Sequence, residues 1–286
     1  YMESQLENNL KSLLNSKLEA LEQYLNADVL VYYGPIGNLN ENVFLKIVEE
    51  LVQSDKHHDT LYIILTTTGG SAITVERYVN IIRYHYSEVN FIVPDYAYSA
   101  GTIFCMSGDN IYMDYFSVLG PIDPQVQNKE GKWVAALGYL DKVNEYIEKA
   151  KNGNLTNVEF SILKDFDLAE LRSFEQARDL TIDLLKKWLV KYKFKNWTKH
   201  HDDSDVTLEE KQNRATEIAE HLSDNNDWKA HGRPINIEAL KELKLKIEDY
   251  SKNADLRAKI RDYYETMSDY IRLKGFPIFI HDRIFL

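Results

Sequence analysis

Cysteine is almost absent from this sequence. Cys105 is the single cysteine among 286 residues, so the chain cannot form an internal disulfide, and no spacing of Cys and His resembles that of a zinc site. This composition is typical of a protein from a reducing compartment. We therefore expect no structural metal.

Basic residues and long apolar runs are also scarce. Lys and Arg number 34 against 45 Asp and Glu, and the resulting net charge of -11 argues against a surface that binds nucleic acid. No apolar stretch approaches the roughly 18 to 20 residues that span a bilayer, and the acidic, amphipathic start YMESQLENNLKSLL does not resemble a signal peptide. We expect a cytoplasmic protein without a membrane span.

Strand-like and helix-like segments alternate through the first half of the chain. Leucines spaced by three and four residues predict an amphipathic helix within residues 1–27. The strands that follow lack polar alternation and are separated by helical segments, which is typical of a mostly parallel sheet buried on both faces. We therefore predict an α/β fold. The predicted strands are DVLVYYGPIG, TLYIILTTT, VNFIVPDYAY and NIYMDYFSVLG.

The second half of the chain has a different character. Runs of β-branched residues vanish after Pro124, and charged helical periodicity takes over from about Leu140. We therefore divide the chain into an amphipathic helix (1–27), an α/β core (28–150) and a helical C-terminal region (151–286).

Two turns that contain glycine or serine follow neighbouring predicted strands. In TTTGGSA, Gly69 and Gly70 can adopt positive φ and leave amides open, although a tight strand-to-helix turn explains the same motif. In YAYSAGT, Ser99 begins a helix, where serine is also a common N-cap. Both turns should open into one crevice, because the carboxyl ends of parallel strands share an edge. There Ser99 could act as a nucleophile, with the amides of Gly70 and Ala100 around an oxyanion.

These turns, followed by GDNIYMDYFSVLGPIDPQ, resemble the serine dehydrogenase proteinase family of the Clp protease/crotonase superfamily. The family is related to signal peptide peptidase A and to the stomatin-specific serine proteases. The resemblance covers about residues 28–151 strongly, and HGRPI also looks like that family's C-terminal region. It implies a spiral of ββα units, a homo-oligomer, Ser99 as nucleophile and an oxyanion hole from Gly70 and Ala100. It implies no cofactor, and no dinucleotide fingerprint is present.

Related proteases use two different arrangements to activate the serine, and each bears on the base that would activate Ser99. Where the Clp-type arrangement has a histidine, this sequence has Asp123. The stomatin-specific proteases use a Ser-Lys dyad, and GYLDKVNEYI resembles the segment that carries their lysine, which puts Lys142 in that place. Apolar neighbours are expected to shelter Lys142 and lower its pKa, as a general base requires, whereas an exposed helix lysine is the alternative. Lys149 and Lys151 lie further along the helix and are weaker candidates.

Other residues have less specific expected roles. Asp123 could polarise the site, contact the substrate or form a turn, and Gly69 and Tyr98 could line the substrate groove or simply pack. His231 and Arg233 of HGRPI could bind a substrate carboxylate, contact a neighbouring subunit or cap a helix. The histidines before Ser99 are expected on solvated surfaces.

The prediction for function is a serine peptidase that hydrolyses peptide or protein substrates, with a Ser-Lys dyad favoured over a Ser-His-Asp triad. The alternative is an inactive scaffold of the same fold, in which Ser99 is only an N-cap and the helical C-terminal region binds a protein partner. Acyl-CoA chemistry is a third possibility, but the Ser-Ala-Gly turn is unlike the glycine-rich turns of those enzymes.

Overall fold

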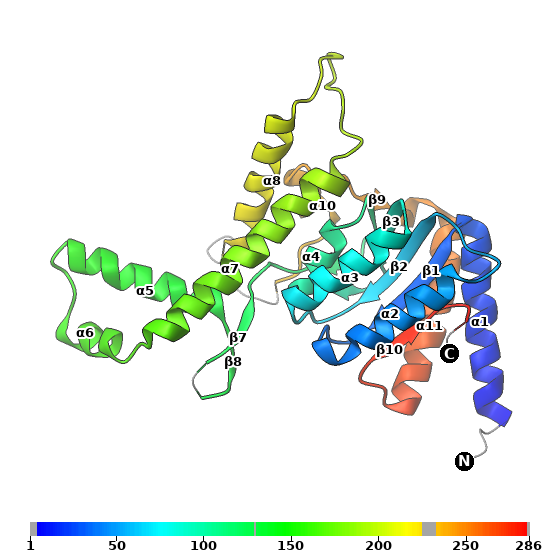
Figure 1. The fold of residues 1–286 in the computed structure, drawn as a ribbon, viewed down its shortest axis with the longest axis horizontal. Coiled ribbons are helices and arrows are strands. Elements are labelled where there is room, and N and C mark those ends of the chain that lie inside the picture. The colour runs from blue at the N-terminus through cyan, green and yellow to red at the C-terminus, as the bar shows by residue number, and fades with distance from the viewer. Residues whose placement is uncertain (1–4, 129, 225–232, 285–286) are drawn as a thin grey trace.

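A largely parallel sheet forms the centre of the molecule (Figure 1). The computed structural model describes residues 5–128, 130–224 and 233–284, and within them the main sheet has six strands in the order β10-β1-β2-β3-β5-β9. Neighbouring strands from β1 to β9 are parallel, and β10 pairs antiparallel with β1. This sheet confirms the predicted α/β fold. The strands are β1 (Asp28–Tyr33), β2 (Thr60–Thr66), β3 (Glu88–Val93), β5 (Asn110–Met113), β9 (Glu248–Asp249) and β10 (Phe279–His281).

Helices cover both faces of this sheet (Figure 1). Leu30 and Ile63 pack with α2, α3 and α4, whereas their chain neighbours Val31 and Ile64 pack with α1 and α11. All four side chains are buried, which explains why the strand sequences are apolar at consecutive positions. The helices are α1 (Gln5–Leu25), α2 (Glu41–Val52), α3 (Ala72–His85), α4 (Ala100–Met106) and α11 (Ala254–Lys274), with short 3-10 turns η1 (Asn38–Asn40) and η3 (Tyr250–Lys252).

A buried histidine joins α1, α11 and β10. The Tyr263 hydroxyl lies 2.6 Å from Nδ1 of His281, and Nε2 lies 2.8 Å from Oδ1 of Asn15. A neutral imidazole satisfies both contacts, because Tyr263 donates to Nδ1 while the N–H at Nε2 donates to Asn15. Burial lowers the pKa of the His281 imidazole to about 3. The folded protein therefore keeps this ring uncharged through mild acid.

We expect mild acid to destabilise the fold through His281. In the unfolded chain its pKa is about 6.5, so between that pH and about 3 the unfolded state binds a proton that the folded state does not. As the pH falls through this range, the free energy of unfolding should therefore decrease, and His281 should contribute up to about 1.4 kcal/mol per pH unit to that decrease. Urea unfolding at several pH values measures the slope of the free energy of unfolding against pH. His281→Gln should flatten it below about pH 6.5, and an unchanged slope would contradict the assignment.

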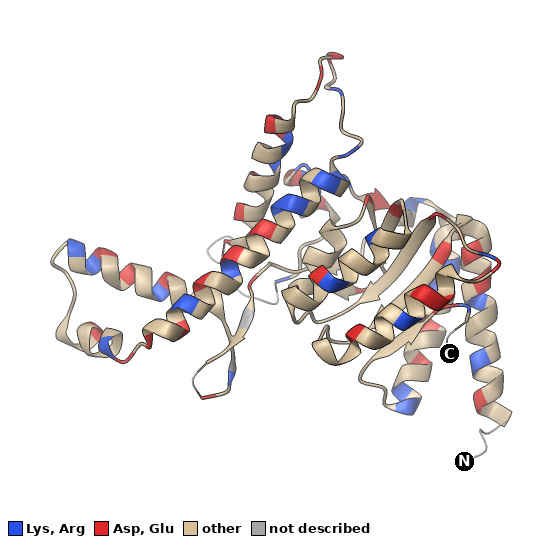
Figure 2. Ribbon diagram, viewed as in Figure 1, with Lys and Arg blue, Asp and Glu red and all other residues tan. Residues whose placement is uncertain are grey.

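Helices α5 and α6, with the first half of α7, project from the body, and we call this part the arm (Figure 1). Its interior is small, with Ala136, Leu140 and Phe174 buried. Charges of both signs alternate along α5 and α7 (Figure 2). The second half of α7 packs into the main core through Leu184 and Leu185. The elements of this region are α5 (Ala136–Lys151), α6 (Asn157–Lys164), α7 (Leu168–Trp188), the π-helix η2 (Leu189–Lys193), α8 (Leu208–Ser223) and α10 (Ile237–Glu242).

The region after residue 150 is less uniformly helical than the sequence predicts. It contributes β9 and β10 to the two edges of the main sheet. Both strands have only two or three residues, so their pairing partner decides their conformation rather than a local pattern. None of the helices in the described parts of the chain combines the length and apolar character needed to cross a membrane.

Two small sheets extend from the carboxyl edge of the main sheet. In the first, β4 (Tyr96–Ala97) pairs parallel with β6 (Val118–Leu119), and in the second, β7 (Gln125–Gln127) pairs antiparallel with β8 (Trp133–Ala135). Ile235 pairs with Leu119 through hydrogen bonds of 2.8 and 2.9 Å. The described part of HGRPI is therefore extended chain beside the first small sheet. His231 lies outside the described residues.

Candidate functional site

Ser99 lies between β4 and α4 in a strained backbone conformation. Its φ is +52° and its ψ is -116°, a region that costs a non-glycine residue about 1 to 3 kcal/mol. Ser99 occupies the N-cap position of α4, yet its side chain makes no capping hydrogen bond. Its hydroxyl donates instead to the carbonyl of Asp123, at 3.4 Å. The interpretation of Ser99 as only a helix cap therefore lacks the contact that defines a cap.

The turn after β2 packs directly on Ser99. Gly69 and Gly70 have φ angles of +97° and +145°. A Cβ atom on Gly69 would lie 2.8 Å from Cβ of Ser99, and a Cβ atom on Gly70 would overlap the carbonyl of Ile36. Only glycine permits this conformation and this close approach. The two turns therefore meet at the carboxyl edge of the sheet, as the order of the strands predicts.

Two backbone amides at this junction lack an acceptor among the described residues. They belong to Gly70 and Ala100. The neighbouring amides differ, because Gly69 donates to Oγ1 of Thr67 at 2.9 Å and Gly101 donates to the carbonyl of Tyr98 at 2.8 Å. Both Gly70 and Ala100 line a large cleft at the surface of this junction. Their amides are therefore available to an oxygen atom of a ligand.

The two turns open into a cleft of about 1070 Å³. The segment after β1 and residues 69–74 form one wall of the cleft. Residues of α7 form another wall, and this contribution from far along the chain has no signal in the sequence. The lining is mostly apolar, and Glu41 is the one ionisable side chain among the described residues that form it. The α7 residues are Ser173, Gln176, Ala177, Leu180 and Thr181.

Lys142 lies on α5 and is not among the residues that line the cleft. Its amine binds Glu145 at 2.7 Å, and its side chain is 51% exposed. The hydrogen bond to Glu145 raises the pKa of Lys142 above its ordinary value. The apolar shelter that the sequence predicts for this lysine is therefore not found, because Lys142 faces solvent and an acidic neighbour. Lys149 and Lys151 are likewise held in ion pairs with glutamates.

Asp123 connects the serine turn to the beginning of α5. It is buried, its carbonyl accepts the hydrogen bond from Ser99, and its Oδ1 accepts one from the amide of Leu137 at 3.1 Å. Tyr98 stacks on Tyr96, with ring centroids 5.2 Å apart, and is not part of the cleft lining. The structure thus brings Asp123 to Ser99, but it places Tyr98 beside the cleft rather than within it.

The sequence predicts that His57 and His58 lie on a solvated surface, but in the structure both contact a buried carboxylate. Their Nδ1 atoms lie 2.9 and 3.1 Å from the buried carboxylate of Asp28, which also binds Arg283 at 2.9 Å. Burial alone would raise the pKa of Asp28, but the hydrogen bonds from these partners outweigh it and lower that pKa. Asp28 begins β1, at the edge of the sheet opposite Ser99, so this network is remote from the cleft.

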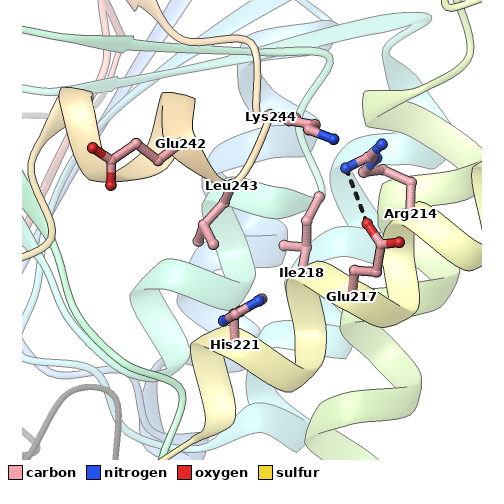
Figure 3. A pocket seen from close by; sticks show the side chains of 7 residues that line it. All are labelled: Arg214, Glu217, Ile218, His221, Glu242, Leu243 and Lys244. Carbon is pink, nitrogen blue, oxygen red and sulfur yellow. Dashed lines mark ion pairs between the residues drawn. The ribbon is translucent and has the colours of Figure 1, made fainter.

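A smaller hollow of about 190 Å³ lies between α8 and the end of α10 (Figure 3). Arg214 and Glu217 form an ion pair of 3.0 Å there, and Lys244 points toward Arg214. None of the residues that the sequence analysis assigns to the site lines this hollow. Within the described residues, no group of three or more His, Cys, Asp or Glu could hold a metal ion.

The chain is similar in sequence to proteins from a methanogenic archaeon. Two uncharacterized proteins of Methanocaldococcus jannaschii are similar to the chain: MJ1495 is 27% identical over 185 residues, and MJ0137 is 28% identical over 186. Each match covers 65% of this chain, and 51% and 52% of the respective relative. The chain therefore spans about half the length of the curated relatives it matches.

Two solved structures and one family model also match. The structures are mutants of the 1510-N membrane-bound stomatin-specific protease. The first has a TM-score of 0.46 at 16% identity and covers 81% of this chain and 82% of that chain. The second, in complex with a substrate peptide, has a TM-score of 0.45 at 17% identity and covers 77% of this chain and 73% of that chain. The family model matches residues 44–270, most of the chain, and the protein therefore belongs to the family of ClpP-like SDH-type serine proteinases.

Proposed function

We propose that this protein is a serine peptidase in which Ser99 attacks the substrate carbonyl and the amides of Gly70 and Ala100 bind the oxyanion. One observation carries the proposal: the strained Ser99 turn lies in the lining of a large cleft, beside two amides that have no acceptor within the described structure. Strained backbone at a functional group and donors aimed at developing charge are features of acyl-transfer sites. Family membership supports the same chemistry.

The proposed reaction begins with proton transfer from the Ser99 hydroxyl to a base. The oxygen attacks the scissile carbonyl, the amides stabilise the tetrahedral oxyanion, and the protonated base then donates to the leaving amine. Water hydrolyses the acyl-enzyme by the same route. We assign the base to Lys142, which must first leave Glu145. Asp123 supports this assignment, because it contacts both Ser99 and the first turn of α5, the helix that carries Lys142.

A fluorophosphonate probe tests the proposal directly. Such probes react only with an activated serine, and mass spectrometry of the digested protein identifies the modified residue. We expect the label on Ser99 in the native protein and no label after denaturation. A folded protein that stays unlabelled would contradict the assignment.

An inactive scaffold that binds a protein partner is the second candidate function. The ion pair between Lys142 and Glu145 favours it, because a lysine held in its charged form cannot accept a proton. In this case the strained Ser99 turn would be a remnant of a catalytic ancestor. Absence of labelling together with a stable, folded protein would select this candidate.

We also propose that the chain self-associates through the arm. Helix α6 buries none of its residues, and Val158, Phe160 and Ile162 are 70%, 54% and 45% exposed. Apolar side chains clustered in this way are typical of interaction surfaces. Sedimentation should give a mass that is a multiple of one chain, and Phe160→Glu should lower it. A wild-type protein that is monomeric at micromolar concentration would contradict this proposal.

A further inference from the structure

One buried threonine is bonded to both turns of the proposed site. Thr67 directly follows β2, and none of its surface is exposed. Its amide donates to the carbonyl of Tyr96 at 3.1 Å, and its own carbonyl accepts a hydrogen bond from the amide of Tyr98 at 3.0 Å. Its hydroxyl oxygen accepts one from the amide of Gly69 at 2.9 Å. The backbone of Thr67 therefore holds the strand that leads to Ser99, while its side chain holds the glycine turn.

The glycine turn is fixed at two successive peptide groups. Oγ1 of Thr67 binds the N–H of Gly69, and the amide of Ile36 donates to the carbonyl of Gly69 at 2.8 Å. That carbonyl and the amide of Gly70 belong to one planar trans peptide group, in which the C=O and the N–H point in opposite directions. Glycine has more conformational freedom than any other residue. These two hydrogen bonds therefore decide where the Gly70 amide points.

The methyl group of Thr67 packs against α4, the helix that begins after Ser99. A Cβ atom added to Gly101, in the first turn of α4, would lie 2.4 Å from Cγ2 of Thr67. The next nearest atoms to such a Cβ are Cβ of Ala97 at 3.3 Å and Cβ of Thr67 at 3.8 Å. Cγ2 of Thr67 is therefore the main obstacle to a side chain at Gly101, and it limits how closely the two turns approach.

We propose that Thr67 is a positioning residue that keeps the amides of Gly70 and Ala100 in the arrangement that an oxyanion requires. This inference rests on the peptidase function proposed above. Thr67 is not among the described residues that line the cleft, so it acts through the two turns rather than on the substrate. Donors stabilise developing charge only when they point at the oxyanion, and a small misplacement slows the reaction. Binding of the uncharged peptide carbonyl depends less on this arrangement.

Thr67→Val removes the hydroxyl and keeps the branched shape of the side chain. The Gly69 amide then lacks its acceptor, so kcat on a quenched fluorescent peptide should fall by about 10- to 100-fold while KM changes by less than about twofold. Fluorophosphonate labelling of Ser99 should slow by a similar factor, because the same amides stabilise the negative oxygen that forms at phosphorus. Thr67→Ser retains the hydroxyl, so both rates should stay within about threefold of the wild-type rates.

Thr66→Val is the matched control. Thr66 is also buried, and its hydroxyl donates to the hydroxyl of Tyr264, on α11, at 3.3 Å. Loss of this hydrogen bond should lower the thermal stability, as Thr67→Val does, but should leave kcat and the labelling rate unchanged. An equal loss of activity in the two valine variants would overturn the proposal, as would a wild-type kcat in Thr67→Val.

A second pair of variants tests the contact with α4 and does not require Thr67→Val to fold. In Gly101→Ala the new methyl group overlaps Cγ2 of Thr67, so labelling of Ser99 should slow by about tenfold. Thr67→Ser lacks Cγ2, and its addition to Gly101→Ala should restore labelling to within about threefold of the rate in Thr67→Ser alone. Failure of this rescue would overturn the proposal.

Failure of this inference is distinguishable from failure of the peptidase function. A wild-type protein that is labelled at Ser99 at the same rate as Thr67→Val contradicts the positioning role alone. A folded wild-type protein that stays unlabelled contradicts the peptidase function, and the positioning role with it.

Discussion

Ser99→Ala should lower peptide hydrolysis by at least about 10⁴-fold while leaving the fold intact. The loss is large because Oγ of Ser99 is the proposed nucleophile, so its removal removes the acyl-enzyme route itself. The effect on stability should be small, because the side chain makes one long hydrogen bond of 3.4 Å. Initial rates on a quenched fluorescent peptide, with thermal unfolding of the same samples, measure both effects.

Ser99→Gly is the matched control for backbone strain. Glycine adopts positive φ freely, so this variant should gain about 1 kcal/mol in free energy of unfolding relative to Ser99→Ala, with the same loss of hydrolysis. A protein that is more stable without its serine would indicate that the strain is retained for activity. Hydrolysis by either variant at the wild-type rate would exclude Ser99 as the nucleophile.

Lys142→Met should lower hydrolysis by about 10²- to 10⁴-fold, the range that a general base contributes. Only the neutral amine can accept the Ser99 proton, and the hydrogen bond to Glu145 raises the pKa of Lys142. The rate should therefore rise with pH well above neutrality as the amine loses its proton. The pH profile of kcat/KM measures the pKa of the base in the free enzyme.

Two variants on the same helix sharpen this prediction. Glu145→Gln removes the anion that holds Lys142 in its charged form, so the pKa of the lysine should fall and the acid limb of the rate profile should move to lower pH. Lys151→Met breaks a similar ion pair, with Glu148, and should leave the profile unchanged. Wild-type activity in Lys142→Met would show that another group, such as Asp123, is the base.

The turns that form the site were predictable because their signals are local. Two glycines after an apolar strand predict positive φ, and both have it. The position of Ser99 at the first turn of a helix follows equally from its neighbours. The strained φ of Ser99 does not, since no local pattern requires it. Gly69 and Asp123, which lie beside Ser99 in the folded chain, come from two other segments, so the surroundings of this residue are set by tertiary structure.

The environment of Lys142 shows the limit of local patterns. Its apolar neighbours in the sequence predict shelter, but a helix turns its residues to different faces, and α5 buries Leu140 and Tyr146 while it turns Lys142 toward solvent. Which face is buried depends on the partner helix, and that partner is α7. The sequence around Lys142 contains no information about α7.

The sequence by itself determined the alternation of strands and helices and the two turns that carry Gly70 and Ser99, because each depends on interactions between near neighbours in the chain. Only the tertiary structure decided that α7 closes the cleft, that Glu41 and Thr181 share its lining, and that β9 and β10 complete the sheet. These features join segments that are distant in sequence. Their contacts form only when the whole apolar core is buried, so no local stretch of sequence predicts them.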